Sequence, residues 1–296
     1  MAHGIPSRFH HCFNAYSLIS LVCFSQPLFA QPAFPLTPGQ QAEASFLQKR
    51  YEDSIRLYTQ IIEDGEGDSH AFRGLIKAYA AAERLADAEE FLKSYISSHP
   101  ESSPAFYAYG YMLYLRDQDG EESLAKALSL DPANSLALNN MGAVLARKKL
   151  FPKAIEMVKK AISINPTELF FYQNLKSIYR ALGKPDLFVD EYREYLLSGP
   201  ASVAEGYGKT IATGLRQEGF KLYSQQKVAE AISAFSRMHQ VYLEIRNVPG
   251  VVAALFSLGL LYEETGDIKN AEKYYREVLE INPGHIQARE KIKDFH

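Results

Sequence analysis

Residues 135–168 read SLALNNMGAVLARKKLFPKAIEMVKKAISINPTE, and this stretch holds two helix signals joined by a short loop. In both halves apolar residues recur at steps of three and four positions, which is the spacing along one face of an α-helix. Pro166 closes the stretch, because proline stops a helix and biases the residue before it away from the α region. The stretch therefore predicts one pair of amphipathic helices.

Prolines at a similar phase mark further pairs along the chain. Pro132, Pro166 and Pro200 follow one another at intervals of 34 residues. Pro100 stands 32 residues before the first of them, and Pro283 occurs near the C-terminus. A helix breaker that returns at this interval indicates repeating units of two helices each.

Small residues follow the same repeat. Glycines lie on the first helix of four units, at Gly110, Gly142, Gly219 and Gly259. Alanines lie on the second helix of four units, at Ala88, Ala154, Ala231 and Ala271. Helix backbones approach closely only where the contacting side chains are small. We therefore expect these alanines to face the glycines.

Two units carry the fullest version of this pattern. The unit at 135–168 carries it through Leu138, Met141, Gly142, Leu145, Phe151, Ala154, Val158, Ala161 and Pro166. The last unit carries it through Leu255, Leu258, Gly259, Tyr262, Gly266, Ala271, Tyr275 and Pro283. Over about residues 35 to 285 the chain resembles the tetratricopeptide repeat family. The resemblance implies an all-α fold, a right-handed α-solenoid of stacked antiparallel helix pairs, that binds another protein or a peptide segment.

The repeat phase divides the chain into seven predicted units. Residues 31–202 hold five of them, at 35–68, 69–102, 103–134, 135–168 and 169–202. Residues 203–211 are an extra stretch, which we interpret as an insertion or a hinge. Two more units follow at 212–251 and 252–285. Residues 286–296 are predicted to form a C-terminal capping helix, because each repeat buries its apolar surface only against its neighbours.

Three units depart from the pattern. The third unit, 103–134, is two residues short in the loop between its helices. The fifth has Lys176, Phe188 and Tyr195 where the pattern has small residues, so we expect its helices to stand further apart. The 40 residues from Gly219 to Gly259 imply lengthened helices in the sixth unit.

The N-terminus has the features of a secretory signal peptide at residues 1–30. Arg8 precedes a short apolar run, Tyr16–Phe24, and Ala30 offers a small residue for cleavage. The run is shorter than the roughly 20 residues that span a bilayer. We therefore expect a periplasmic or otherwise exported protein whose mature chain does not insert into the membrane. An uncleaved N-terminal membrane anchor is the alternative.

The remaining chain has little of the chemistry that catalysis needs. Both cysteines, Cys12 and Cys23, lie in the first thirty residues, and no two later histidines stand three or four positions apart, as a zinc-binding helix requires. Residues 206–210, GYGKT, lack the glycine that a phosphate-binding loop has five places before its second glycine, where Val203 stands. The net charge of −3 argues against binding a phosphate backbone. We predict no catalytic residue, cofactor, metal or nucleic-acid partner.

In the repeat family the first helix of each pair lines a concave face. The resemblance places twelve partner-binding side chains there: Arg73, Lys77, Tyr107, Tyr111, Asn139, Asn140, Arg147, Gln173, Asn174, Arg180, Arg216 and Phe220. Aromatic rings supply buried area, amides can hydrogen-bond an extended backbone, and arginine can pair with a carboxylate. Packing between neighbouring helices is the alternative for each tyrosine. The amides are more informative, because Asn139–Asn140 and Gln173–Asn174 stand at equivalent phases of consecutive units.

These observations predict a non-enzymatic scaffold in the cell envelope that binds a segment of another protein in its concave groove. The alternative is a structural subunit of an envelope assembly, such as secretion, pilus or polysaccharide machinery, that acts by self-association or attachment. Fold alone does not decide between them. The oligomeric state is left open by the sequence.

Overall fold

Residues 35–295 are the part of the chain that the computed structural model describes, and every regular element in that range is a helix. Backbone contacts divide the chain into two units. The first unit lies within Phe34–Ile211, and the second lies within Ala212–His296. The predicted signal peptide, residues 1–30, lies outside the described residues. The predicted fold class, an all-α solenoid of stacked helix pairs, is confirmed.

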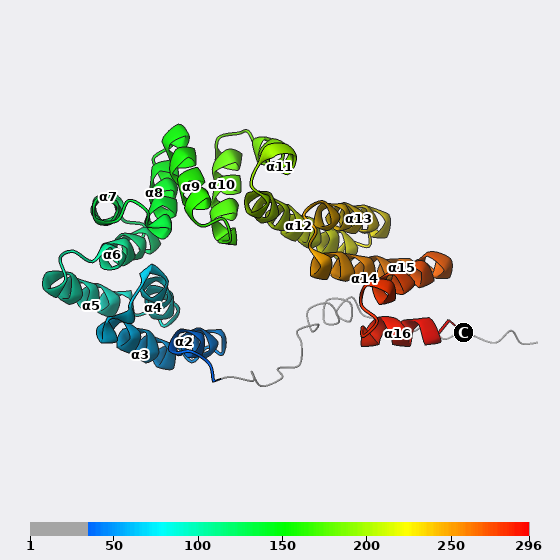
Figure 1. Cartoon of the computed structure of the whole chain (residues 1–296), viewed down its shortest axis with the longest axis horizontal. Helices are drawn as coiled ribbons and strands as arrows, with labels where there is room; N and C mark the ends of the chain where they lie inside the picture. Colours follow the sequence, from blue (N-terminus) through cyan, green and yellow to red (C-terminus); the bar gives the residue numbers. More distant parts are fainter. Residues whose placement is uncertain (1–34, 296) are drawn as a thin grey trace, which may run out of the picture. The chain divides into compact units, whose positions relative to one another are not determined.

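Helix pairs of the first unit follow one another along an arc, from α2 in blue to α11 in light green (Figure 1). The helices are α2 (Pro38–Leu47), α3 (Tyr51–Ile61), α4 (Ser69–Ala81), α5 (Leu85–Ser98), α6 (Ser103–Leu115), α7 (Glu121–Leu130), α8 (Ser135–Arg147), α9 (Phe151–Ile164), α10 (Leu169–Ala181) and α11 (Leu187–Ser198). A π-helical turn, η1 (Ile62–Glu66), extends α3. Each of the first five predicted units holds one of these pairs.

The second unit contains the last part of α12 (Ala201–Ser224) and four more helices. These are α13 (Val228–Glu244), α14 (Val248–Glu264), α15 (Ile268–Ile281) and α16 (Ile286–Lys293). Helices α13 and α14 have 17 residues each, against 13 and 14 in α8 and α9. This extra length accounts for the 40-residue interval that the sequence shows in this region.

The predicted boundary between the last two units, at residue 252, is wrong. Helix α14 already begins at Val248, where Pro249 stands in its first turn. The side chain of Asn247 caps this helix by accepting a hydrogen bond from the backbone N–H of Gly250 at 2.8 Å. A side-chain cap and an N-terminal proline both favour a helix start, so the last unit begins four residues earlier than predicted.

Residues 203–211, interpreted above as an insertion or a hinge, form part of the continuous helix α12. They are packed into the first unit rather than set apart from it. The side chain of Tyr207 is 1% exposed, and its ring centroid lies 4.7 Å from that of Phe188 in α11. The interpretation as a separate element is therefore corrected.

The repeated glycines accept a larger partner than the alanines expected to face them. A Cβ atom on Gly142 would lie 2.5 Å from Val158 Cγ2 and 3.0 Å from the backbone oxygen of Ala154. The backbone of Ala154 therefore lies close to Gly142. The side chain of Val158, four residues later, occupies the space that a side chain on Gly142 would need. The same relation joins Gly219 to Phe235 and Gly259 to Tyr275.

Candidate binding surface on the inner face of the first unit

The first helices of consecutive pairs in the first unit are linked at their N-terminal ends. Asn134 caps α8, because its Oδ1 accepts a hydrogen bond from the backbone N–H of Ala137 at 3.0 Å. Its Nδ2 donates to the hydroxyl oxygens of Ser69 at 2.9 Å and Ser103 at 3.0 Å. Since Asn134 is 5% exposed, one buried amide joins the ends of α4, α6 and α8.

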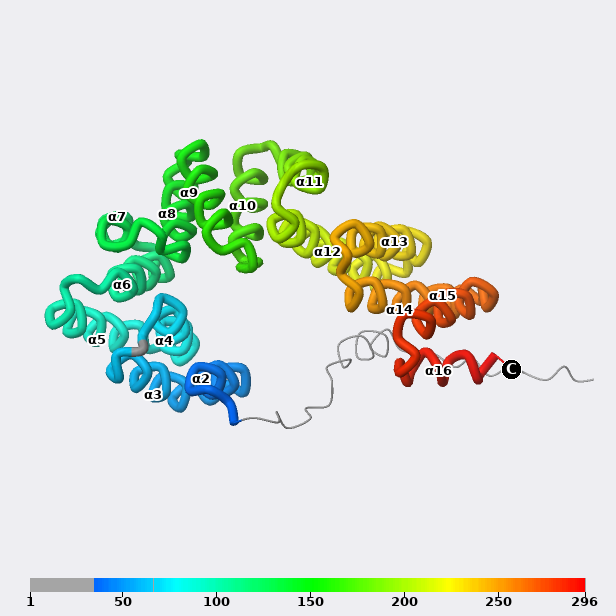
Figure 2. Tube along the Cα trace, in the orientation of Figure 1, coloured from blue at the N-terminus to red at the C-terminus, as the bar shows by residue number. Residues whose placement is uncertain are grey.

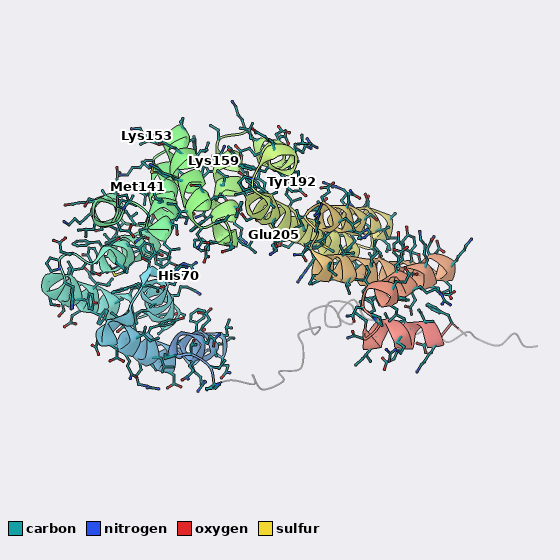
Figure 3. All side chains as sticks on the ribbon, in the orientation of Figure 1. His70, Met141, Lys153, Lys159, Tyr192 and Glu205 are labelled. Atoms are coloured by element: carbon teal, nitrogen blue, oxygen red, sulfur yellow. The ribbon has the colours of Figure 1, made fainter. Side chains whose placement is uncertain are left out.

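Helix α4 also contacts α10, three repeats further along the chain. His70 Nε2 lies 3.0 Å from Glu168 Oε1, and the guanidinium carbon of Arg73 lies 4.2 Å from the ring centroid of Phe170. We call these four residues the α4–α10 contact. Figure 3 labels His70 on α4. Because each repeat is expected to touch only its neighbours, the sequence did not predict this contact.

Charged groups of the α4–α10 contact act on one another. The carboxylate of Asp68, whose Oδ2 lies 3.7 Å from His70 Nδ1, is the largest cause of a raised His70 pKa; burial opposes the rise, and the hydrogen bond with Glu168 adds to it. The nearby His70 is also the main reason why the pKa of Asp68 lies below its usual value. Two carboxylates, one at the start of α4 and one at the start of α10, therefore favour the charged form of the imidazole.

Arg73 has an aromatic environment. Burial raises the pKa of both Tyr107 and Tyr111, and the nearby charge of Arg73 partly opposes this rise. The two tyrosine rings are parallel, with centroids 6.2 Å apart. Among the described residues Arg73 has no carboxylate partner. Its guanidinium therefore has aromatic neighbours and no ion pair.

Three asparagine side chains form a second polar feature of the inner face, which we call the amide ladder. Asn174 Nδ2 donates to Asn139 Oδ1 at 3.0 Å, and Asn139 Nδ2 donates to Asn140 Oδ1 at 3.2 Å. Asn140 is 8% exposed, and its Nδ2 is buried without a hydrogen-bond partner among residues 35–295. The amide ladder thus ends in an unsatisfied donor, which is rare in folded proteins.

Two of the predicted partner-binding residues are covered rather than presented. Tyr107 and Asn139 are each 1% exposed. For Tyr107 this matches the packing alternative stated for the tyrosines, and contact of either residue with a partner stays a prediction. Tyr111 is partly buried, and Gln173 is exposed outside the amide ladder.

Two other predicted residues contact neighbouring repeats, and a third is exposed and lies outside the amide ladder. Lys77 pairs with Glu43 at 3.6 Å and lies over the ring of Phe46. Arg147 pairs with Asp117 at 2.9 Å and lies 4.1 Å above the ring of Tyr114. These cations join consecutive repeats. Arg180 is exposed, one turn after the partly buried Lys176.

Arg216 and Phe220 belong to the second unit and are described apart from the others. The guanidinium of Arg216 lies 5.9 Å from the ring centroid of Phe220, which packs edge-to-face on Phe235 at 5.4 Å. Phe220 is therefore partly a core residue of its own helix pair. The packing alternative was stated for the tyrosines, and Phe220 shows the same kind of contact.

Two further findings concern residues 35–295. No helix in this range is long and apolar enough to cross a bilayer. The same range has no cluster of three or more histidine, cysteine, aspartate or glutamate side chains arranged to bind a metal ion.

The helix pairs and their small-residue contacts define a class of helical repeat protein, and comparison with known proteins gives that class a name. Two family models described as tetratricopeptide repeat match residues 45–108 and 210–283. The chain therefore contains tetratricopeptide repeats in both of its units. Among curated protein sequences, none matches the chain.

Solved structures with a similar arrangement include three repeat proteins. The MamA protein is 24% identical, with 52% of this chain and 86% of that chain covered and a TM-score of 0.38. YrrB, described as a TPR protein with an unusual peptide-binding site, is 19% identical, with 68% and 97% covered and a TM-score of 0.36. The C-terminal part of a TPR repeat-containing protein from Cytophaga hutchinsonii is 15% identical, with 85% and 98% covered and a TM-score of 0.39. At these identities the likeness concerns the fold.

Proposed function

We propose that the protein is a non-catalytic scaffold that binds an extended segment of another polypeptide on the inner face of its first unit. The observation that carries the proposal is the buried, unpartnered Nδ2 of Asn140. Leaving such a donor unsatisfied costs about 1–3 kcal/mol, so it is retained most simply where it has a use. A backbone carbonyl oxygen of a bound segment is the acceptor that an amide donor of this kind fits.

The position of the amides supports a repeating mode of recognition. Asn140 and Asn174 stand 34 residues apart, at the same phase of consecutive repeats. Amide side chains have no strong helix propensity that would place them there. Asn174 is partly exposed and already holds Asn139 in place. A bound segment that runs along consecutive repeats is therefore expected to meet Asn174 first and Asn140 one repeat away.

The cellular setting belongs to the same proposal. The features of residues 1–30 favour export, so the scaffold acts in the periplasm or elsewhere outside the cytoplasm, with N-terminal anchoring as the alternative. The net charge of −3 favours a polypeptide partner over a nucleic acid. The proposal includes no cofactor and no metal.

Self-association as a structural subunit receives less support. That alternative was motivated by the unusual fifth repeat and by residues 203–211. In the structure both are used internally, because Phe188 and Tyr207 are each 1% exposed and contact each other. A binding scaffold is therefore the function that the first unit supports best.

Photocrosslinking in cells tests the proposal. A photoreactive residue at the exposed inner position Gln173 is compared with one at Lys160, an exposed position on the second helix of a pair. We expect the inner position alone to capture a specific polypeptide. The captured segment is then titrated against the purified protein, where Asn140→Ala weakens binding by about tenfold. Gln118→Ala, an exposed amide in the same unit, is the control. Equal capture from both positions, or equal affinity of both variants, rejects the proposed groove.

A further inference from the structure

The α4–α10 contact brings the start of one helix against the inner face of another, 98 residues away in the sequence. We propose that His70 and Arg73, with the rings of Tyr107 and Tyr111, form a recognition site for a polypeptide segment that carries a carboxylate two residues before an aromatic ring. In the closed unit, Glu168 to Phe170 of this chain occupies that site. The inference deepens the proposed function and rests on it.

Arg73 differs from Lys77 and Arg147, the two other predicted partner-binding cations of the first unit that lie over rings. Lys77 has both a ring, Phe46, and a carboxylate, Glu43. Arg147 likewise has the ring of Tyr114 and the carboxylate of Asp117. Arg73 has the ring of Phe170 and no carboxylate among the described residues. Its planar fork of N–H donors is suited to a carboxylate, and this half of its binding capacity is unused.

The chain's own segment supplies part of what the site accepts. Phe170 covers one face of the Arg73 guanidinium, and the Glu168 carboxylate reaches His70 instead of Arg73. An incoming segment with the same spacing can place its ring over Arg73 and its carboxylate between His70 and Arg73. Such a ligand makes the contacts of the internal segment and adds a charge-assisted pair that the internal segment lacks.

The internal contact is built to be replaceable. His70 is 50% exposed and Glu168 is 26% exposed, so their ion pair lies in contact with water, where such pairs contribute little. The contact also joins repeats that share no helix interface, so losing it leaves the pairs α4–α5 and α10–α11 intact. Tyr107 is 1% exposed and lies near this contact, because the charges of both Arg73 and Glu168 act on its hydroxyl. Release of α10 from α4 is therefore expected to make the Tyr107 ring available to a bound segment.

A peptide from the chain itself is the direct probe. The capped peptide INPTELFFYQ, which copies residues 164–173, is labelled and titrated against the full protein by fluorescence anisotropy. The double variant Glu168→Gln with Phe170→Ala removes the internal occupant. We expect it to bind the peptide at least about tenfold more tightly than the wild type, because the site no longer has a competitor. A peptide with the glutamate changed to glutamine and the first phenylalanine to alanine is expected to lose that gain.

The contribution of Arg73 is tested in the double variant, which lacks the internal occupant of the site. Adding Arg73→Ala to the double variant is expected to weaken peptide binding by about tenfold or more. Adding Arg56→Ala instead, at an exposed arginine of α3, is expected to leave it unchanged. Circular dichroism and hydrogen exchange of α4 and α6 confirm that each variant stays folded. Equal affinity of wild type and folded double variant overturns the proposal, as does peptide binding that is indifferent to Arg73.

These outcomes are separate from those of the proposed function. If crosslinking from Gln173 captures a partner that depends on Asn140 while the peptide shows no preference for the opened protein, the acidic–aromatic site is rejected and the scaffold stands. If Gln173 captures no specific partner, the proposed function fails independently of the peptide result.

Discussion

Two neighbouring helix pairs of the first unit share one register but are packed in different ways. Positions 135–168 and 169–202 align without a gap, so that Gly142 corresponds to Lys176 and Ala154 to Phe188. Helices α8 and α9 run side by side (Figure 2), and their backbones come close at many more positions than those of α10 and α11. The pair with the larger side chains at these positions is thus the more widely spaced one, as expected if side-chain size sets the spacing.

The space left between α10 and α11 is filled by α12. The ring of Tyr207 lies 5.1 Å from that of Tyr172, 4.7 Å from Phe188 and 5.4 Å from Tyr195, measured between centroids. The hydroxyl of Tyr207 donates to Glu191 Oε2 at 2.6 Å. The wide pair is therefore packed against a third helix. The pair α8–α9 closes on itself, whereas the pair α10–α11 depends on α12.

Removal of the Tyr207 ring is expected to cause the largest loss of stability among the variants that test this difference. Tyr207→Ala is expected to destabilise the α10–α12 region by about 3–5 kcal/mol, because a fully buried aromatic side chain is replaced by a cavity. Hydrogen exchange measured by mass spectrometry on peptides from residues 187–211 reports the loss. Peptides from α8 and α9 should keep most of their protection.

The conservative variant Tyr207→Phe separates the ring from its hydroxyl. It loses only the hydrogen bond to Glu191, which also accepts from Tyr179 at 2.5 Å and pairs with Lys159. We expect a cost of about 1.5 kcal/mol. If Tyr207→Ala costs no more than Tyr207→Phe, the ring does not support the wide pair and the comparison is wrong.

The sequence predicted much of this difference but not its solution. Lys176, Phe188 and Tyr195 stood at positions that require small residues in a close pair, and the structure agrees that α10 and α11 are further apart. What fills the gap was not predicted, because residues 203–211 lie outside the repeat phase. Their apolar pattern does not indicate the helix pair against which they pack.

The role of the candidate site stays a prediction, but the structure shows which of its residues lie together. Asn139, Asn140 and Asn174 share a repeat phase, and the amide ladder joins all three. The burial of Tyr107 agrees with the packing alternative that the sequence left open, whereas the α4–α10 contact was not predicted. That contact depends on a small rotation that accumulates from pair to pair, and the sequence of a single repeat does not indicate its size.

Leucine placed at the two equivalent positions tests the spacing itself. Gly142→Leu must displace Val158 and the backbone of Ala154, whose nearest atoms would lie only 2.5 Å and 3.0 Å from the new Cβ atom. We expect a loss of about 3 kcal/mol. Lys176→Leu fills a site that already accommodates a long side chain, so it should change stability by less than about 1 kcal/mol.

Both leucine variants are measured by thermal unfolding together with hydrogen exchange, because a chain of two units need not unfold in one step. Burial and the adjacent Arg180 lower the pKa of Lys176, so its charged form is disfavoured in the folded chain. The penalty is present at low pH and is relieved as pH rises toward the ordinary lysine value. Lys176→Leu should remove this dependence. Equal costs at the two positions would contradict the spacing argument.

The residues that begin α8 and α10 offer a smaller test, since Asn134 and Glu168 also correspond in register. Both reach α4, but Asn134 does so through a buried amide and Glu168 through a partly exposed ion pair. Asn134→Ala is expected to cost about 2 kcal/mol, because it removes a helix cap and leaves two serine hydroxyls without their partner. Glu168→Ala, which removes no side-chain cap from α10, should cost less than about 1 kcal/mol. Chemical unfolding of the two variants gives the ranking, and the reverse order would contradict it.

The smallest effect concerns pH at the α4–α10 contact. The pKa of His70 is raised, first by the nearby carboxylate of Asp68 and then by the hydrogen bond with Glu168, against an opposing effect of burial. A raised pKa means that the folded state favours the protonated ring, so its stabilisation is fully present below the ordinary value of 6.5. It is lost as pH rises through the raised pKa. The closed contact is therefore expected to be firmest in mildly acidic solution.

An NMR titration of the histidine rings checks this sign. His70 should titrate above 6.5, and Glu168→Gln should move its pKa toward the ordinary value by less than Asp68→Asn does, because the Asp68 carboxylate is the larger cause. His239, whose pKa burial lowers, belongs to the second unit and should not respond to either change. A His70 pKa that is indifferent to Glu168 would show that the two helices are not joined in solution. The inner face would then be open without a ligand, and the covered state of Tyr107 would need another cause.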